Sequence, residues 1–331
     1  MEQLSLPDDK HKDWIQLKSY EMLKGKLKHL YDGKLEFKSD KLKTLTLDWK
    51  DIRQLRTAGV VSIGFSDLSS RSGQLTLING EAFLDGENFD KKQLLTIIAG
   101  NEQETNYWSA KISLGANLKK GNNQQTDFNT QINARRRTTQ SRLDLSYLGS
   151  YSRADGKESS NNHRLNGNFD WFISERFFLR PIFAEVYRDP FQNISYQVTL
   201  GSGLGYSILD TSKTEWNVSA GPAYAYTQFD NVAVGERSSE QGEALLLETL
   251  FETEISEEID FRSLYRVIYT NEDKGGYNHH ALVKLAIELT SILDLDLSVI
   301  WDRNNAPAAN MNNVTPDPND YQFIIGVGVD I

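Results

Sequence analysis

Five histidines are the first candidates for chemistry in this chain of 331 residues. A histidine serves as a general base only within hydrogen-bond reach of a nucleophile, with a third group orienting it. His279 and His280 are adjacent, so on a strand their side chains point to opposite faces and cannot share one site. His163 follows two asparagines, and His11 and His29 have no acidic or hydroxyl motif around them. We expect no catalytic residue and no enzymatic activity.

Metal and phosphate motifs are also weak. Asp317 and Asp320 offer oxygen ligands, but their spacing does not match a calcium loop. Gly201, Gly203 and Gly205 alternate along one predicted strand instead of opening a helix, as a nucleotide-binding loop would. The absence of cysteine excludes a thiolate zinc site and a disulfide scaffold. The sequence therefore predicts no metal and no cofactor.

Composition excludes two further classes. No run of about 20 apolar residues exists, which excludes a bundle of membrane-spanning helices, and the mean hydropathy is −0.51. The net charge of −10 argues against a nucleic-acid partner, whose phosphates would be repelled. Aromatic residues nevertheless reach 11% of the chain. Their positions, together with the strand pattern, decide the fold class.

Residues 13–100 contain an internal duplication of short strands. The first copy runs from Trp14 to Phe37 and from Thr44 to Leu55, and the second from Val61 to Leu84 and from Asn88 to Ile97. Each copy has a tight turn closed by a glycine, Gly33 or Gly80 in turn, of the kind that joins two strands of a hairpin. The pattern predicts a small duplicated SH3-like β-domain, read either as a docking or wall-binding module or as a folded spacer.

Residues 1–12 are polar, and we expect them to be disordered. They contain no apolar central run of the kind found in a secretory signal. If the protein is exported, the chain shown has been trimmed.

From residue 106 to residue 331 the strands become longer and alternate strictly between apolar and polar residues. The last strand shows this best, because every second residue from Tyr321 to Ile331 is apolar. Segments of this period and length are typical of strands that cross a membrane as a barrel. We expect about twelve, near residues 108–118, 126–137, 142–151, 163–172, 177–187, 194–209, 215–226, 244–255, 261–269, 278–289, 294–301 and 321–331. The predicted fold is an all-β chain whose second domain is an antiparallel transmembrane β-barrel.

The links between these strands alternate in length, which predicts an orientation. Longer links are expected at residues 119–125, 152–162, 188–193, 230–242, 271–277 and 302–320, and shorter ones at 138–141, 173–176, 210–214, 256–260 and 290–293. Outer-membrane barrels have short periplasmic turns and longer external loops. The first strand therefore starts in the periplasm, and so does the domain before it.

Aromatic residues at the predicted strand ends form two girdles, as expected at the two interfaces of a membrane. The predicted interface residues are Trp108, Trp171, Trp216, Trp301, Tyr151, Tyr187, Tyr226, Tyr269 and Tyr321. The alternative is a soluble β-sandwich in which these aromatics form the core.

Charged residues fall on the polar face of the strands, which a membrane barrel turns toward its lumen. The predicted lumen-facing residues are Lys111, Asp127, Arg135, Arg142, Asp144, Arg164, Asp170, Glu248, Glu252, Arg262, Arg266, Lys284 and Glu288. Both signs are present, so ion pairs across the lumen are expected. Arg180 and Glu185 have opposite parity along one strand, which indicates either a β-bulge between them or a wrong register.

The barrel region also resembles a known family. The segments NYWSAKISLGANLKKGNNQQTDFN, SRLDLSYLGSYSRADG and KTEWNVSAGPAYAYTQF are similar to the salt-induced outer membrane protein family, a bacterial family of unknown function. This resemblance implies a Gram-negative outer-membrane location with the first domain in the periplasm. It assigns no catalytic residue. Ile331 departs from the aromatic residue with which such barrels commonly end.

Three functions follow, in decreasing order. The first is a narrow, porin-like channel or transport protein with a charged lumen, for which Arg135, Arg142, Arg164 and Glu252 are the first residues to mutate. The second is a structural anchor or adaptor whose periplasmic domain binds a partner or peptidoglycan. The third is an enzyme at the barrel rim. Expected partners are outer-membrane lipid and the barrel assembly machinery, without nucleic acid.

Overall fold

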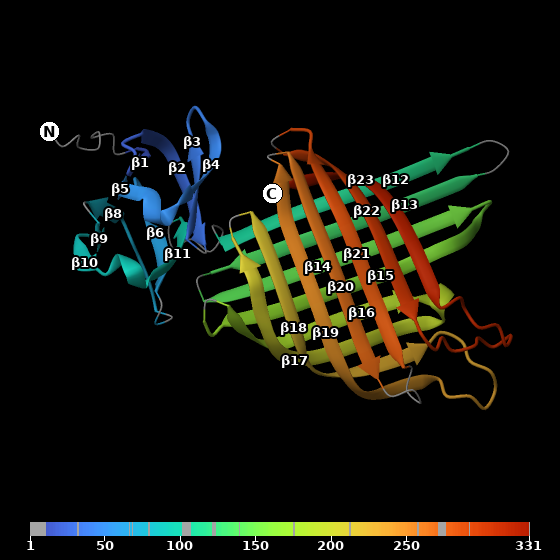
Figure 1. Cartoon of the computed structure of the whole chain (residues 1–331). Helices are drawn as coiled ribbons and strands as arrows, with labels where there is room; N and C mark the ends of the chain where they lie inside the picture. Colours follow the sequence, from blue (N-terminus) through green and yellow to red (C-terminus); the bar gives the residue numbers. More distant parts are fainter. Residues whose placement is uncertain are drawn as a thin grey trace.

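We describe the fold from a computed structural model of the chain. The structure describes residues 11–31, 33–65, 67, 69–78, 80–100, 107–120, 124–138, 140–174, 176–211, 213–256, 258–270, 276–290 and 292–330. The predicted disorder of residues 1–10 and the departure at Ile331 lie outside these residues. The chain forms two all-β parts, an N-terminal domain and a barrel (Figure 1). No helix in the described part of the chain is long and apolar enough to span a lipid bilayer.

The N-terminal domain is built from eleven short strands of one antiparallel sheet. These are β1 (Asp13–Leu17), β2 (Met22–Tyr31), β3 (Lys34–Ser39), β4 (Lys43–Asp48), β5 (Ile52–Arg56), β6 (Val61–Phe65), β7 (Ser70–Gly73), β8 (Leu75–Ile78), β9 (Glu81–Leu84), β10 (Glu87–Phe89) and β11 (Leu94–Ala99). Short 3₁₀ helices, η1 (Trp49–Asp51) and η2 (Lys91–Gln93), precede the last strand of each half.

The duplication predicted from the sequence is visible in this strand order, because β1 to β5 and β6 to β11 repeat one sequence of elements. The two halves exchange their last strands. The first half's β5 pairs with β8 of the second half, and β11 of the second half pairs with β2 of the first. Side chains of both halves, among them Leu27 and Leu75, share a single buried cluster. The expected pair of separate SH3-like barrels is therefore wrong in this respect: the domain is one curled sheet with one core.

The second part is a closed antiparallel barrel of twelve strands. Its strands are β12 (Trp108–Lys119), β13 (Gln125–Arg137), β14 (Ser141–Ala154), β15 (Lys157–Phe172), β16 (Phe177–Asp189), β17 (Ile194–Asp210), β18 (Thr214–Phe229), β19 (Ser239–Ser256), β20 (Ile259–Thr270), β21 (Tyr277–Glu288), β22 (Leu293–Asn304) and β23 (Asn319–Asp330). Closure joins β12 to β23, with Leu114 opposite Val327. Closure leaves no unpaired sheet edge, the condition for strands to cross a bilayer.

The barrel has a proximal end, where β12 starts and β23 finishes, and a distal end opposite to it. Figure 1 shows the N-terminal domain beside the proximal end. An ion pair joins the two parts there, with Lys43 Nζ 3.9 Å from Glu258 Oε1. The shorter links predicted from the sequence all lie at this end, since they join β13 to β14 and every second pair after it.

One predicted long link is wrong. The strands β14 and β15 continue much further than expected and are joined by Asp155 and Gly156 alone. Both residues have positive φ, 47° and 80°, as a tight hairpin turn requires. Polar residues that resemble a loop in sequence, between Ser152 and Asn162, thus form a hairpin that is paired from strand to strand. The link from Asp230 to Ser238 and the link from Asn305 to Pro318 are long, as expected.

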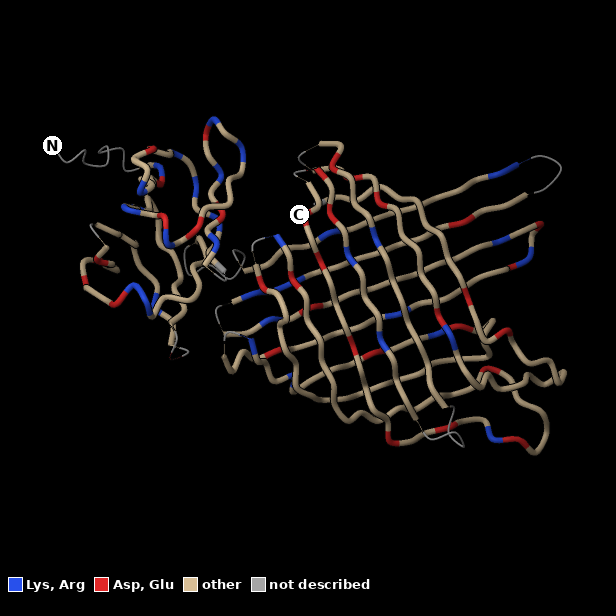
Figure 2. The backbone as a smooth tube through the Cα atoms, viewed as in Figure 1, with Lys and Arg blue, Asp and Glu red and all other residues tan. Residues whose placement is uncertain are grey.

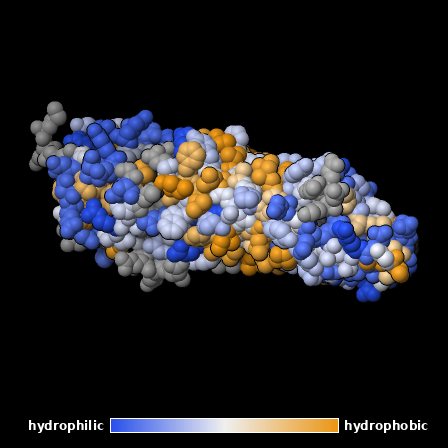
Figure 3. All heavy atoms as spheres, turned by 90° about the horizontal axis from the view of Figure 1, so that it is seen from below, coloured by the Kyte–Doolittle hydropathy of each residue, from blue (hydrophilic) through white to orange (hydrophobic). Residues whose placement is uncertain are grey.

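The outer wall of the barrel is apolar. Leu114, Leu165, Leu200, Leu204 and Ile325 each expose more than half of their surface. Figure 3 shows one face of the molecule, on which hydrophobic residues gather over the barrel between the hydrophilic N-terminal domain and the hydrophilic distal end. An exposed apolar belt around a closed barrel fits a lipid environment.

Candidate functional site in the barrel interior

A β-bulge in β16 decides which charges enter the barrel interior. Its pairing with β17 shifts between Arg180 and Phe183, and its pairing with β15 shifts at the same height. Pro181, which has no N–H to donate to a ladder, occupies the bulge. The extra residue turns both Arg180 and Glu185 inward, where they are 4% and 2% exposed. The bulge expected from their opposite parity is therefore present.

A continuous series of alternating charges, which we call the ion-pair chain, begins on β14. Arg142 Nη2 lies 2.7 Å from Asp170 Oδ2, and Arg180 Nε donates to the other oxygen of Asp170 over 2.7 Å. Arg180 Nη1 then donates to Glu248 on β19, again over 2.7 Å. Asp170 and Arg142 are almost fully buried, at 0% and 1% exposure.

The ion-pair chain continues from Glu248 through a second arginine. Arg266 Nη2 lies 2.5 Å from Glu248 Oε2, and Arg266 Nη1 lies 2.5 Å from Glu185 Oε2. Arg164 donates to the remaining oxygen of Glu185 over 2.9 Å and to Asp302 Oδ1 over 2.7 Å. Because β15 and β22 lie seven places apart in a ring of twelve, the last pair reaches almost straight across the lumen.

A second group of charges lies nearer the proximal end. Arg135 of β13 contacts Asp144, Glu215 and Glu252, with distances of 2.5, 3.2 and 3.0 Å. Glu215 also pairs with Arg142, and Glu252 with Arg262. These contacts link the second group to the start of the ion-pair chain. Acidic and basic residues recur along the strands in Figure 2.

A third group stands beside the closure of the barrel. Lys284 Nζ lies 2.8 Å from Asp296 and donates to Ser113 Oγ over 3.1 Å. Lys111 pairs with Asp294 and lies 3.8 Å from Asp296. Each buried charge of this group therefore has a partner of opposite sign, as the low-dielectric interior requires.

Two predicted lumen residues stand apart from these groups. Asp127 lies at the distal end, where it accepts hydrogen bonds of 3.0 Å from Asn117 and Gln125. Glu288 is exposed at the proximal end, next to the start of β22. The structure brings the other eleven predicted lumen residues into the three charged groups.

Apolar side chains occupy other parts of the interior. Leu148, Ile300 and Ile324 form one buried cluster, and Phe183, Leu246 and Ile268 form another. Phe178 is fully buried against Gly205, where any side chain would collide with its ring. Charged and apolar groups together fill most of the cross-section.

The described side chains leave two cavities inside the barrel. The proximal cavity has a volume of about 450 Å³, and Arg135, Glu252, Arg262 and Lys284 are among its lining residues. A distal cavity of about 40 Å³ is lined by Arg164, Glu185, Tyr187 and His280, among others. Arg266 lines both. The ion-pair chain thus stands between the two cavities.

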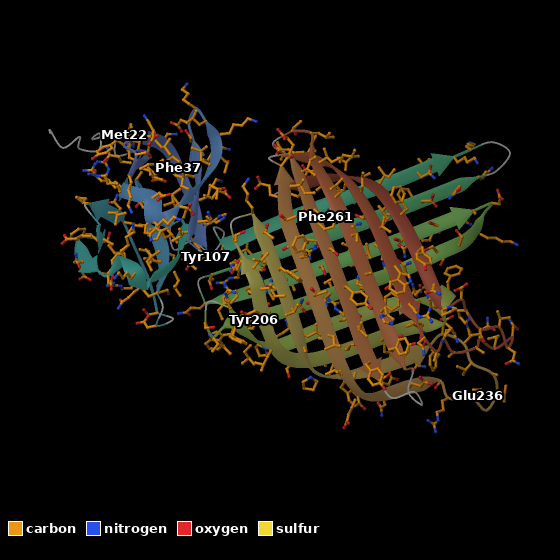
Figure 4. The ribbon with its side chains drawn as sticks, in the orientation of Figure 1. Met22, Phe37, Tyr107, Tyr206, Glu236 and Phe261 are labelled. Carbon is orange, nitrogen blue, oxygen red and sulfur yellow. The ribbon has the colours of Figure 1, made fainter. Side chains whose placement is uncertain are left out.

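The predicted interface aromatics lie on the outer wall with one exception. Trp171, Tyr321 and Tyr269 expose 56%, 71% and 51% of their surface, and Figure 4 shows Tyr206 and Phe261 near the proximal end. Tyr187 is the correction, since it is only 7% exposed. Its ring lies 4.0 Å from the Arg164 guanidinium, and its hydroxyl donates to Asp189 over 3.0 Å. The bulge in β16 reverses its predicted direction.

Remaining aromatics from the prediction have neighbours on the same wall. Tyr226 stacks with Tyr196, Trp216 meets Phe251 edge to face, and Trp301 stacks with His279. Trp108 is 40% exposed, and Tyr151 is half-buried on β14.

The histidines of the barrel do not share a site. His280 is buried in the interior, where its Nδ1 lies 2.8 Å from Asp302, whereas His279 lies on the outer wall against Trp301. His163 contacts the Tyr147 hydroxyl at 2.8 Å and Asn161 at 2.9 Å. Among the described residues, no three His, Asp or Glu side chains are placed to hold a metal ion.

Sequence reasoning missed several members of the charged groups. Glu215 and Asp294 stand at the first residues of β18 and β22, where strand boundaries are hardest to place. Parity with Asn217 and with Asp296 would have assigned both to the interior. Arg137 lies at the end of β13, where it pairs with Asp210 over 2.9 Å.

A closed antiparallel barrel with an apolar outer belt and a charged interior defines an integral β-barrel protein of the bacterial outer membrane. Over residues 112–331, the chain matches the family described as "Protein of unknown function, DUF481", and it belongs to that family. This agrees with the resemblance to an outer-membrane barrel family of unknown function.

Solved barrels show distant similarity. The NanC porin has a TM-score of 0.39 and 8% identity, covering 67% of this chain and 98% of the porin. The outer membrane channel DcaP of Acinetobacter baumannii has a TM-score of 0.26 and 11% identity, covering 96% and 93%. A FadL homologue of Pseudomonas aeruginosa has a TM-score of 0.27 and 8% identity, covering 96% and 86%. The comparison with curated proteins gives no match.

Proposed function

We propose that the protein is a narrow outer-membrane channel or transport protein whose charged lumen is restricted by the ion-pair chain. One observation carries the proposal: a single buried arginine, Arg266, lines both the proximal and the distal cavity. Movement of this side chain away from Glu248 and Glu185 would join the two cavities. The smallest passage then runs along paired charges, which suits a small polar solute.

The chemistry of the interior supports a conduit over a passive anchor. Burying ion pairs carries a desolvation cost, and replacing them by packed apolar residues is often neutral or stabilising. A barrel that only anchored a domain would gain nothing from so many buried charges. A polar interior that can hydrate when the pairs separate is what passage of a polar solute requires.

We place the N-terminal domain in the periplasm. The short links of the barrel lie at the proximal end, beside this domain, and the long links at Asp230–Ser238 and Asn305–Pro318 lie at the distal end. Outer-membrane barrels have short periplasmic turns. Protease added to intact cells should leave the domain uncut, and protease added after outer-membrane permeabilisation should remove it.

A structural anchor is the second candidate. It is favoured by the near-complete burial of Asp170, Arg180 and Arg266, which leaves the two cavities separate in this conformation. In that case the N-terminal domain carries the activity, and its partner is a periplasmic protein or peptidoglycan. Both candidates share contacts with lipid and with the assembly machinery, and neither includes an enzymatic step.

Single-channel conductance of the full chain in planar bilayers separates the candidates. The variant Glu248→Ala with Arg266→Ala removes both partners of a central pair, so that no unpaired charge remains. We expect brief, small openings for the wild type and openings several-fold larger for the double variant. The matched control is Lys213→Ala with Glu254→Ala, which removes a pair of 3.1 Å at the exposed proximal rim. This control should conduct as the wild type does.

Silence of the wild type and of both variants, with folded barrels shown by heat-dependent gel mobility, would overturn the channel and leave the anchor. Larger openings in the rim control than in the central variant would also contradict a restriction at Arg266.

A further inference from the structure

A cleft of about 930 Å³ lies between the N-terminal domain and the proximal end of the barrel. Residues of β2, such as Lys26 and Lys28, line one side, and Trp108, Arg135 and Arg137 line the other. Arg135 also lines the proximal cavity inside the barrel. The cleft is therefore continuous with the entrance to the lumen.

The cleft is rich in cations. Its basic lining residues are His11, Lys12, Lys26, Lys28, His29, Arg135 and Arg137, against Asp13 and Glu36 as the acidic ones. The Asp13 carboxylate is already used by the fold, because its two oxygens accept hydrogen bonds of 2.6 Å from the backbone N–H groups of Leu27 and Ala58.

Lys26 and Lys28 are the cations without a countercharge. Both are exposed on the outer face of β2, and neither ammonium has an acidic partner within 4.0 Å among the described residues. Lys26 stands directly opposite Lys38 across the β2–β3 ladder. Like charges in such cross-strand pairs destabilise a sheet, so the arrangement is unfavourable unless an anion lies nearby.

The duplication shows that the fold itself does not need these cations. Counting from Gly25 in the first half and Gly73 in the second, the residues equivalent to Lys26 and Lys28 are Gln74 and Thr76. The second half forms the same strand with neutral side chains. The two lysines are thus a feature of the half that faces the barrel.

His29 responds to this environment. Burial and the nearby Arg137 and Lys28 lower the pKa of His29 to about 4. Glu36 lies 3.6 Å from His29 Nε2, which acts in the opposite direction. Because burial and the surrounding cations outweigh that single carboxylate, His29 is neutral at pH 7.

We propose that this basic cleft binds small phosphate- or carboxylate-bearing anions at the mouth of the barrel. The binding site stands on the cleft alone. Its further meaning, that anionic solutes are the class admitted to the lumen through Arg135, rests on the proposed channel function.

Titration calorimetry of the detergent-solubilised full chain with inorganic pyrophosphate tests the site. We expect binding that weakens as KCl rises, because salt screens exposed charges. Lys26→Gln with Lys28→Gln should weaken it at least about tenfold, since two nearby charges are lost. The control, Lys50→Gln with Lys92→Gln, changes equivalent lysines of η1 and η2 that do not line the cleft, and should bind as the wild type does. No binding, or equal loss in both double variants, overturns the proposal.

A second arm identifies the natural source of the anion. The same titration is done in vesicles of phosphatidylcholine and in vesicles that also contain phosphatidylglycerol. Weaker pyrophosphate binding in the anionic vesicles, seen for the wild type and lost in Lys26→Gln with Lys28→Gln, assigns the cleft to a lipid headgroup. Equal binding in both vesicles assigns it to a free solute.

The failures of the two proposals are distinguishable. Pyrophosphate binding by a barrel that never conducts retains the anion site and removes the channel. Conductance by a protein that binds no pyrophosphate removes the anion site alone.

Discussion

Arg135 and Glu252 join opposite walls of the barrel: Nη2 of the arginine lies 3.0 Å from Oε2 of the glutamate, although β13 and β19 are six places apart in a ring of twelve strands. A strand ladder cannot make such a contact, because it connects only neighbours. Side chains that meet across the lumen therefore set both the width of the interior and its electrostatic balance.

The first prediction concerns this bridge. Glu252→Gln removes a carboxylate that Arg135 and Arg262 share, and we expect the free energy of unfolding to fall by about 1–3 kcal/mol, between the values for exposed and for buried pairs. Urea titration of the full chain in lipid vesicles measures the change. Glu254→Gln, on the exposed rim, is the control and should change stability by less than about 0.5 kcal/mol. Equal losses in the two variants would contradict a specific role for the bridge.

The second prediction concerns Asp170, which is fully buried between Arg142 and Arg180. Asp170→Ala leaves two buried guanidinium groups without their shared carboxylate, so we expect a loss of about 3–5 kcal/mol. Loss of the heat-dependent shift in gel mobility at lower urea concentration gives the readout. Asp170→Ala combined with Arg180→Ala should recover part of the loss. If the double variant is as unstable as the sum of the single variants, the two residues are not coupled.

Packing inside the lumen gives the third prediction. A side chain at Gly205 would collide with the Phe178 ring, so Gly205→Val should destabilise the barrel by about 1–3 kcal/mol. Phe178→Ala in the same chain makes room for the new side chain and should remove most of that additional cost. A double-mutant cycle by urea titration measures the coupling. A coupling near zero would show that the two residues do not share one space.

The fourth prediction tests the shared core of the N-terminal domain. Leu75→Ala leaves a cavity in a cluster that also contains Trp49 of the other half, at an expected cost of about 2–5 kcal/mol. The two halves should still unfold together. The probe is the fluorescence of Trp49, isolated by comparison with Trp49→Phe, during urea titration of the full chain. An unchanged midpoint for Trp49 would mean that the halves fold as two independent barrels. Lys92→Ala, on the surface, serves as the control.

Most of the architecture could be predicted from the sequence because it depends on local rules. Alternation of apolar and polar residues, as between Tyr321 and Ile331, follows from the two faces of a strand and fixes which side meets lipid. The twelve strands, the inner charges and the duplication of the first domain all follow from such patterns. The predicted hairpin glycines, Gly33 and Gly80, have the positive φ that their turns require.

Local rules also set the limits of the prediction. The polar run between Ser152 and Asn162 resembles a loop, yet a positive-φ turn at Asp155 and Gly156 lets it pair as a hairpin. One bulge at Pro181 reverses parity and so brings Glu185 into the ion-pair chain and Tyr187 off the outer wall. Neither change alters composition or average pattern, so neither is visible in the sequence period.

The sequence by itself determined the strands, their faces and the membrane-barrel class, since each of these depends on neighbours along the chain. Only the tertiary structure decided which charges meet. Arg164 reaches Asp302, and Arg266 joins Glu248 to Glu185, because closure of the ring and the stagger of its strands bring distant positions to one height. The exchange of β5 and β11 between the two halves of the N-terminal domain is decided in the same way, because either half alone leaves an open edge and an uncovered core.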